Sequence, residues 1–470
     1  MVFAMTELQQ TENRWTKPAH YAPQTHSHRL ELWKLGYRAL FAEIGNKPLV
    51  IAFSMGLRSI VEQSKWVQDN LGYKIVWVSR EVKGMRYERE HDVLAGDLKT
   101  ILKLARLRKQ NTNTVALLVH MAAPHGSAWR IKDMIPGCKA CCYLYDAINL
   151  WVPRDKLHLW DQYQNSKGSN AGEYEAAEDV MRGDYIEGLV YKDYGPNWPV
   201  LDNCKAITAW APSVHEKNLF TDPPPQNVPE RFCFIGTIMP KTTHERPAGL
   251  FSDIMMEDIF ASVAAQGYNI HAYVLNLSEE VRKEYRARFT NGRVQLFQGA
   301  LLTYLLPRLA GRYKWGWMLY NFPQQIIMPL IHNTLPTKLF TYMTLCIPIV
   351  VSEEFKAVAR FVTEHNIGVV VKRNEHNNIP AVLARYNHTE LVSNILKVRD
   401  QYCIDRYLAC MGDVIKQVME GPTKPIPKKP KFLELEADHY AKTQQKAPQT
   451  FYESKRSWCY EEGKNTVERE

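Results

Sequence analysis

The chain has 470 residues, 45% of them hydrophobic and 23% charged, a balance typical of a folded globular protein and not of a disordered one. At about 100–200 residues per domain, this length predicts two domains with extensions. No apolar run reaches the roughly 18 residues of a membrane-spanning helix. The stretch from Met1 to Gln24 is polar and lacks a signal-peptide core, so a cytoplasmic location is the default expectation. The net charge of +9 suits anionic partners without choosing among nucleotides, lipid headgroups and nucleic acid.

Residues 1–46 are predicted to form a leader that ends in one helix. Apolar residues recur at helical spacing over residues 29–45, with basic residues between them. This stripe could dock the helix on the first domain, or it could make a peripheral contact with a membrane surface. We favour docking, because a docked helix requires nothing beyond the stripe.

Residues 47–220 alternate strand-like apolar runs with helical patterns, which predicts a domain built on a doubly wound parallel sheet. A basic helix is expected at 91–110 and another helix at 127–134. Cys138, Cys141 and Cys142 alternate as in a buried strand. No second cysteine pair stands at matching spacing, so no metal is expected there. The strands are expected at 48–53, 73–78, 114–120, 138–145, 188–193 and 206–210.

Residues 221–230 contain three successive prolines and are predicted to be a stiff linker. Residues 231–400 then repeat the β–α pattern and predict a second domain of the same class. A helix is expected at about 390–418, and residues 421–470 are expected to be a mostly flexible tail. The strands of this domain are expected at 232–236, 270–275, 294–297, 314–320, 349–351 and 368–371.

The most informative stretch is residues 336–352, where a helix and a strand adjoin. Pro336 can open a helix, Lys338 falls in its first turn, and Pro348 stops it before the apolar run Ile349-Val350-Val351. A helix N-terminus that carries a lysine beside a parallel strand can hold a phosphate group.

This stretch resembles the Pro-x-Lys-Leu-x-Glu-Tyr and Gly-x-Pro-Val-Val-x-Ser pattern of GT-B glycosyltransferases, especially the GT4-like retaining group. The chain departs from it at Thr341, where that family has a ribose-binding Glu, and at Cys346, where Gly is usual. The resemblance implies a GT-B fold: two Rossmann-like doubly wound domains that face a central cleft. It also implies that the last helix, at 401–420, crosses back to the first domain.

Several chemical motifs are absent from the sequence. There is no Gly-x-Gly-x-x-Gly, P-loop, zincin helix or nucleophile elbow. There is no Asp-x-Asp either, so we expect no metal-bound diphosphate. Lysines and helix dipoles would then neutralise the leaving diphosphate.

The donor-binding candidates follow from strand ends and from the resemblance. Glycine at a strand end lets a ligand approach the backbone, and a lysine after this strand is common in GT4-like enzymes. Each charged member of the set could instead be an ordinary solvated side chain. The candidates are Gly236, Thr237, Lys241, Asn321, Thr337, Lys338 and Thr341.

Candidates in the first domain follow its strands. Ser54, Met55 and Gly56 form the acceptor-side loop. His120, His125 and Asp146 are the catalytic candidates, and the resemblance implies that a histidine here meets the donor sugar. Either histidine could instead be structural, and a lone carboxylate at a strand end is weak evidence.

The predicted function is therefore transfer of a sugar from a nucleotide-diphosphate sugar to an acceptor, with retention at the anomeric carbon and without a metal. No cofactor is expected beyond this co-substrate. The acceptor could be a glycan, a lipid-linked molecule or nucleic acid. Two alternatives remain: a DNA-modifying glycosyltransferase, which the basic residues from Lys99 to Lys109 permit, and a catalytically silent binding protein, which the departures at Thr341 and Cys346 permit.

Overall fold

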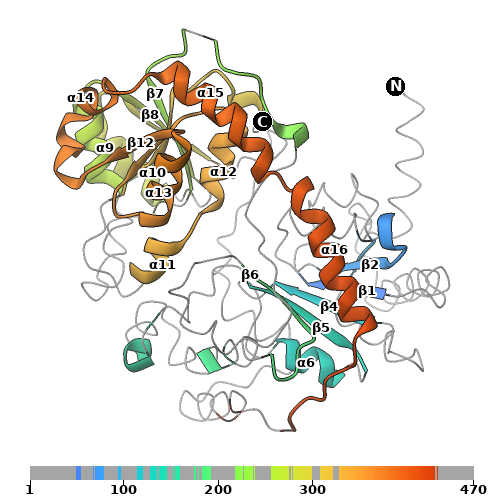
Figure 1. Ribbon diagram of the computed structural model, residues 1–470. Helices are drawn as coiled ribbons and strands as arrows, with labels where there is room; N and C mark the ends of the chain where they lie inside the picture. Colours follow the sequence, from blue (N-terminus) through green and yellow to red (C-terminus); the bar gives the residue numbers. More distant parts are fainter. Residues whose placement is uncertain are drawn as a thin grey trace, which may run out of the picture.

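The computed structural model contains two six-stranded sheets with their helices (Figure 1). The leader helix expected at 29–45 and the strand expected at 206–210 lie outside the described residues. The structure describes residues 49–53, 67, 69–78, 94–96, 114–119, 127–134, 137–144, 152, 154–158, 174–175, 178, 183–191, 217–225, 227–236, 238, 256–274, 277, 279–298, 307–320, 328–428, 431 and 434.

The first sheet has the strand order β3-β2-β1-β4-β5-β6, and every pairing in it is parallel. The chain moves outward in one direction from β1 and in the other from β4, so the order reverses between these neighbours. The strands are β1 (Leu49–Phe53), β2 (Lys74–Val78), β3 (Leu94–Gly96), β4 (Thr114–Val119), β5 (Lys139–Leu144) and β6 (Gly188–Tyr191).

One sequence-based prediction in this domain was wrong. The basic helix expected at 91–110 cannot include residues 94–96, because these form β3 and pair with β2. The run Leu-Ala-Gly is apolar and short, as an edge strand can be, whereas the basic residues that suggested a helix lie after it. The helix expected at 127–134 is confirmed as α6 (Ser127–Met134).

The second sheet has the order β12-β11-β10-β7-β8-β9 and is also parallel throughout. Its order reverses between β7 and β10. The predicted pair of doubly wound parallel sheets is thus confirmed. The strands are β7 (Arg231–Gly236), β8 (Asn269–Val274), β9 (Val294–Gln298), β10 (Trp315–Met318), β11 (Ile349–Ser352) and β12 (Gly368–Val371).

The centre of the second sheet is fully buried because its strands are apolar on both faces. β10 and β11 are buried at every position, as expected where helices cover a parallel sheet on both sides. The helices α9 (Met256–Ala265) and α13 (Lys356–His365) pack against β8 and against β11 and β12, respectively. The Trp317 ring meets Phe260 edge-on, with 4.8 Å between ring centroids.

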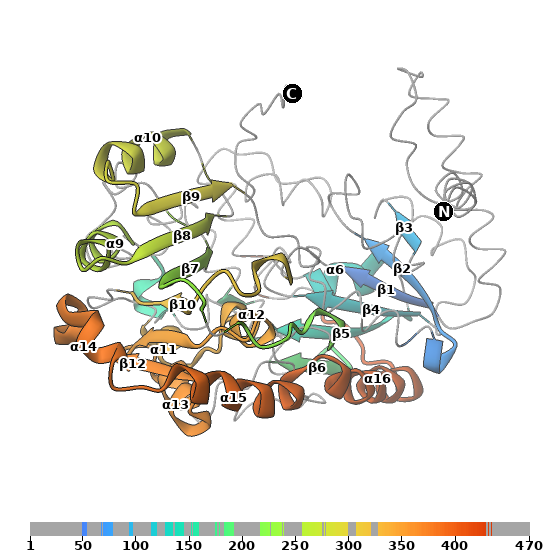
Figure 2. The same cartoon turned by 90° about the horizontal axis from the view of Figure 1, so that it is seen from above.

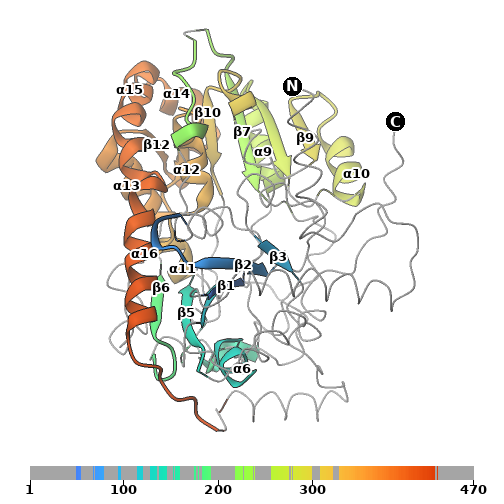
Figure 3. The same cartoon turned by 90° about the vertical axis from the view of Figure 1, so that its right-hand side faces the viewer.

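The chain returns to the first domain through two helices instead of the single helix expected at 390–418. α15 (His388–Val398) ends in a short 3₁₀ turn, and α16 (Asp405–Glu420) begins after Cys403, whose backbone is extended. α16 contacts β4, β5 and β6, and Figures 1 and 3 show it running from the second domain along the first. A Cβ on Gly188 of β6 would lie 2.5 Å from the Val418 side chain, so glycine permits this close packing.

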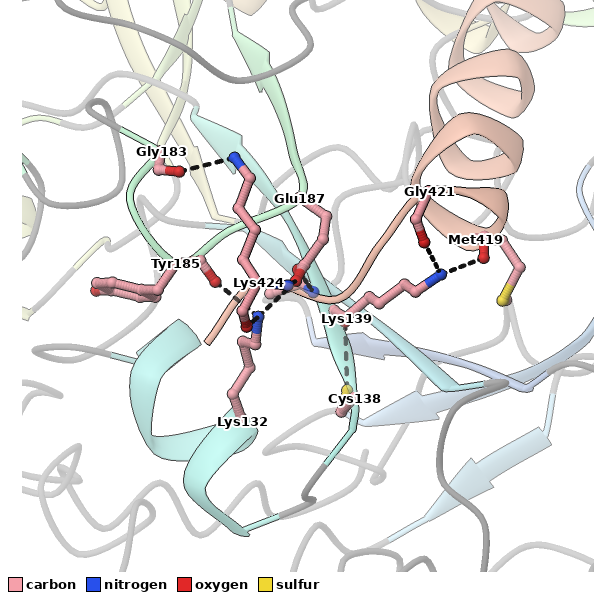
Figure 4. Close-up of polar contacts among 10 residues, drawn as sticks. Lys132, Cys138, Lys139, Gly183, Tyr185, Glu187, Met419, Gly421 and Lys424 are labelled. Carbon is pink, nitrogen blue, oxygen red and sulfur yellow. Dashed lines mark hydrogen bonds and ion pairs between the residues drawn. The ribbon is translucent and has the colours of Figure 1, made fainter. Parts of the chain in front are cut away.

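The segment after α16, residues 421–428, lies against the first domain. We call it the strap. The Lys139 ammonium donates to the carbonyls of Met419 and Gly421, the latter at 2.5 Å, and so caps the end of α16 (Figure 4). Trp129 Nε1 donates to the Pro427 carbonyl at 2.7 Å. The described beginning of the expected tail is therefore held by side chains of α6 and β5.

The chain passes between the domains near residues 217–221 and again near residues 399–405, and these two segments are in contact. Arg399 Nη1 donates to the Thr221 carbonyl at 2.6 Å, and its guanidinium lies 4.7 Å from the centre of the Phe220 ring. The Lys217 N–H donates to the Asp405 carboxylate at 3.3 Å. Figure 2 shows α15 and α16 following one another along one side of the molecule. If one domain moved relative to the other, these two connecting segments would therefore move together.

Candidate functional site

The candidate site lies at the carboxyl edge of the second sheet, where the strand order reverses. Gly236 ends β7, and Tyr320 follows the neighbouring strand β10 by two residues. In open parallel sheets the crevice at such a switch point is the usual place for a ligand. Helix α12 (Thr337–Thr344) begins at the same edge, so three segments of the chain converge there.

Helix α12 is held at this edge by hydrogen bonds, and its N-terminus is uncapped. Pro336 is the N-cap, with no side-chain cap, and the first turn has no acidic residue. The N-terminal N–H groups therefore have no acceptor, and the partial positive charge no counter-charge, among the side chains of the first turn. Tyr342, fully buried, donates its hydroxyl toward the carbonyls of Cys233 at 2.9 Å and Trp317 at 3.1 Å. These bonds attach the helix to β7 and β10 at once.

Lys338 brings a positive charge to the switch point. Its ammonium donates a hydrogen bond to the Tyr320 hydroxyl and lies 5.0 Å from the centre of the Phe234 ring. A Cβ on Gly236 would lie 3.1 Å from Nζ, so the glycine leaves room for the ammonium. No carboxylate in the described part of the chain forms an ion pair with Lys338. A half-buried ammonium at a helix N-terminus without a counter-charge is suited to bind an anion.

Thr337 and Thr341 lie on either side of Lys338 in the helix. Thr337 is exposed at the first helical position, where its N–H has no intrahelical acceptor. Thr341 is 5% exposed, and its hydroxyl donates to the Thr337 carbonyl at 3.2 Å. The hydroxyl that replaces the Glu of the resembled pattern is thus engaged with the backbone of its own helix.

Cys346, the other departure from that pattern, ends α12. Its φ is +54°, in the left-handed region. The Cys346 N–H donates to Met343 at 3.1 Å and the Ile347 N–H to Tyr342 at 2.9 Å, which is a Schellman motif with Cys346 at C′. This explains why glycine suits the position. The cysteine's Sγ accepts from Arg399 Nη1 at 2.9 Å, a contact that glycine would lack.

Of the sequence-predicted donor residues, Gly236, Thr337, Lys338 and Thr341 are described, and the structure brings Gly236 and Lys338 into contact. Sequence reasoning missed Phe234 as a neighbour of the lysine. The available signal was its place near the end of β7, two residues before Gly236. Outside the described residues lie Thr237, Lys241, Asn321, Ser54, Met55, Gly56, His120, His125 and Asp146.

The described residues contain no group of three His, Cys, Asp or Glu side chains placed to hold a metal ion. None of the helices within them has the length and apolar character to cross a bilayer.

Comparisons with known proteins identify the fold. A glycosyltransferase from Rickettsia africae ESF-5 superposes with a TM-score of 0.50 at 11% identity, covering 80% of this chain and 100% of that one. WaaG, a glycosyltransferase involved in lipopolysaccharide biosynthesis, gives 0.45 at 11% identity over 79% of this chain and 100% of its own. No protein-family profile and no curated protein matches the sequence. The fold is GT-B, as predicted.

Proposed function

We propose that the protein is a glycosyltransferase that moves a sugar from a nucleotide-diphosphate sugar to an acceptor. The observation that carries this proposal is the Lys338 ammonium, which stands without a described carboxylate partner at the switch point of a GT-B donor-side sheet. The resemblance of residues 336–352 to the GT4-like pattern supports retention at the anomeric carbon. The acceptor class, whether glycan, lipid-linked molecule or nucleic acid, is left open.

Charge development on the leaving group explains why this arrangement would accelerate transfer. As the bond from the anomeric carbon to the diphosphate oxygen breaks, negative charge grows on the diphosphate. Lys338 and the first N–H groups of α12 would meet that charge with donors already held in place. Gly236 would let the diphosphate approach the end of β7. We propose Lys241, Thr237 and Asn321 as further donor contacts, and metal-independent transfer, on the sequence argument alone.

In this proposal the first domain binds the acceptor and takes up its proton. The residues after β1 (Ser54, Met55 and Gly56) would bind the acceptor. Asp146 or one of His120 and His125 would take the acceptor proton. β1 and β4 form the switch point of the first sheet, so the chain that follows them leaves from the edge where ligands usually bind.

A catalytically silent binding protein is the rival function, and one observation favours it. The Thr341 hydroxyl donates to the backbone, whereas the resembled pattern has a carboxylate that binds ribose at this position. A binding protein would retain affinity for nucleoside diphosphates without transferring a sugar.

The first experiment is a thermal-shift screen with UDP, GDP and ADP, followed by transfer assays with the sugars of whichever nucleotide binds. A ligand at 100 times its Kd stabilises by about 2.7 kcal/mol, which such a screen detects. Stabilisation by none of the three would overturn the proposal. Binding without transfer to any glycan, lipid or DNA acceptor would favour the silent protein.

Lys338→Met then tests the assigned residue. We expect the transfer rate to fall by about 10²–10³-fold, the usual effect of losing one electrostatic donor. Lys397→Met is the matched control, because Lys397 is exposed on α15 of the same domain and the charge change is identical. Equal rates in the two variants would remove Lys338 from the site.

A further inference from the structure

The Lys338 ammonium is held by a phenol and an aromatic ring. It donates to the Tyr320 hydroxyl, and the Nζ atom lies 5.0 Å from the ring centres of both Tyr320 and Phe234. The Tyr320 hydroxyl lies between Nζ and its own ring, so this contact is a hydrogen bond and not a contact with the ring face. Phe234 has no such group and meets the ammonium directly.

Tyr320 is itself fixed by the neighbouring strand. Its backbone N–H donates to Ser352 Oγ at 2.8 Å, and Ser352 Oγ donates back to the Tyr320 carbonyl at 2.9 Å. Ser352 is fully buried at the end of β11, and the Tyr320 ring packs edge-on against Phe355 with 5.3 Å between centroids. The hydroxyl that receives the lysine therefore has a defined position, because main chain and ring are both restrained.

Because the Tyr320 hydroxyl and the Phe234 ring are neutral, they hold Lys338 without cancelling its positive charge. A carboxylate would hold the lysine but cancel its charge and compete with an incoming anion. A phenol accepts one N–H and a ring attracts the cation through its quadrupole, and both leave the net charge intact. With one N–H committed to Tyr320 and space kept open by Gly236, the remaining N–H groups are restricted in direction.

We infer that Tyr320 is a positioning residue, which orients Lys338 toward the diphosphate of the donor without contacting the donor itself. This inference rests on the proposed function. Phe234 assists, because its ring centre lies 5.0 Å from the ammonium. The pair would lower the cost of ordering a long, flexible side chain when the diphosphate arrives.

Calorimetric titration with inorganic pyrophosphate and with the nucleoside diphosphate found in the screen tests this inference. Tyr320→Phe keeps the ring and removes only the acceptor, and we expect it to weaken binding of both ligands by about five- to tenfold, the usual net value of one intramolecular hydrogen bond. In the Lys338→Met background the same substitution should change nothing. Losses that add in the double variant would show that Tyr320 contacts the ligand directly, and wild-type affinity in Tyr320→Phe would exclude any role.

A second measurement separates failure of this inference from failure of the proposed function. In protein labelled with ¹³Cε-lysine, the Lys338 resonance is identified by its loss in Lys338→Arg. The Phe234 ring should shift it upfield without any ligand, and Tyr320→Phe should move it, whereas Tyr386→Phe, an exposed tyrosine of the same domain, should not. If no nucleotide binds wild type, the proposed function fails while this spectrum still reports how the lysine is held. A Lys338 resonance that Tyr320→Phe leaves in place overturns the inference by itself.

Discussion

Lys132 and Glu187 form a buried ion pair with 2.6 Å between Nζ and Oε1, and their side chains are only 3% and 4% exposed. Both also bind the main chain of Lys424 in the strap. Its N–H donates to Glu187 Oε1 at 2.7 Å, and Lys132 Nζ donates to its carbonyl at 2.8 Å (Figure 4). The ion pair thus binds both main-chain polar groups of Lys424, the N–H and the carbonyl. These are the groups that a neighbouring strand would bind in a sheet.

We expect Glu187→Gln to destabilise the first domain by about 3 kcal/mol, because it leaves the Lys132 charge buried without its partner. Chemical denaturation measures this loss, and hydrogen exchange at the Lys424 amide should accelerate in parallel, since Glu187 is its acceptor. The control is Glu364→Gln, which removes an exposed i,i+4 pair with Arg360 and should cost less than about 0.5 kcal/mol. Equal effects of the two substitutions would contradict this account of the strap.

Cys346 offers a test of backbone strain at the end of α12. An L-residue in the left-handed region costs roughly 1 kcal/mol, so Cys346→Gly should be more stable than Cys346→Ala by about that amount. Both variants lose the Sγ contact with Arg399, so their difference isolates the backbone term. Thermal or chemical unfolding measures it. An alanine variant as stable as the glycine variant would mean that the position carries no strain.

The same residue shows how far sequence reasoning reached. The helix and the strand within residues 336–352 follow from local patterns, as does the lysine in the first turn of that helix, because caps, prolines and apolar runs act over a few positions. The only signal in the sequence for the left-handed backbone of Cys346 is that the resembled pattern usually has glycine at this position. The contact between Lys338 and Phe234 joins residues more than a hundred positions apart, and no local pattern encodes it. Short edge strands such as β3 are missed for a related reason, since three residues carry too little periodicity.

Gly236→Ala is expected to weaken nucleoside diphosphate binding by about tenfold, comparable to losing a charge-assisted hydrogen bond, because the new Cβ would lie 3.1 Å from both Lys338 Nζ and Phe234 Cζ and displace the ammonium. Its effect should shrink in the Lys338→Met background. Gly292→Ala is the control, with a φ of +68° and no atom within 4 Å of the added carbon. It should lower stability and leave binding unchanged. Unaltered binding in Gly236→Ala would mean that the lysine does not need this space.

Glu257 supplies a prediction about pH. It lies in the first turn of α9, is 1% exposed, and finds no hydrogen-bond donor for either carboxylate oxygen among the described residues. Burial raises the pKa of this carboxyl above its ordinary 4.5, and the nearby Glu284 adds to the shift. The folded state therefore binds the proton more tightly than the unfolded state, so stability is lost as the pH rises from about 4.5 through the raised pKa.

Glu257→Gln removes this titration, so the stability of the variant relative to wild type should increase as the pH rises toward 8, with the advantage vanishing toward pH 4. Denaturation at a series of pH values measures the difference. Glu279→Gln makes the same charge change on a side chain that is 86% exposed, and surface substitutions of this kind usually stay within about 0.5 kcal/mol. A stability difference between Glu257→Gln and wild type that does not grow with pH would show that the buried carboxyl has a partner that compensates its charge.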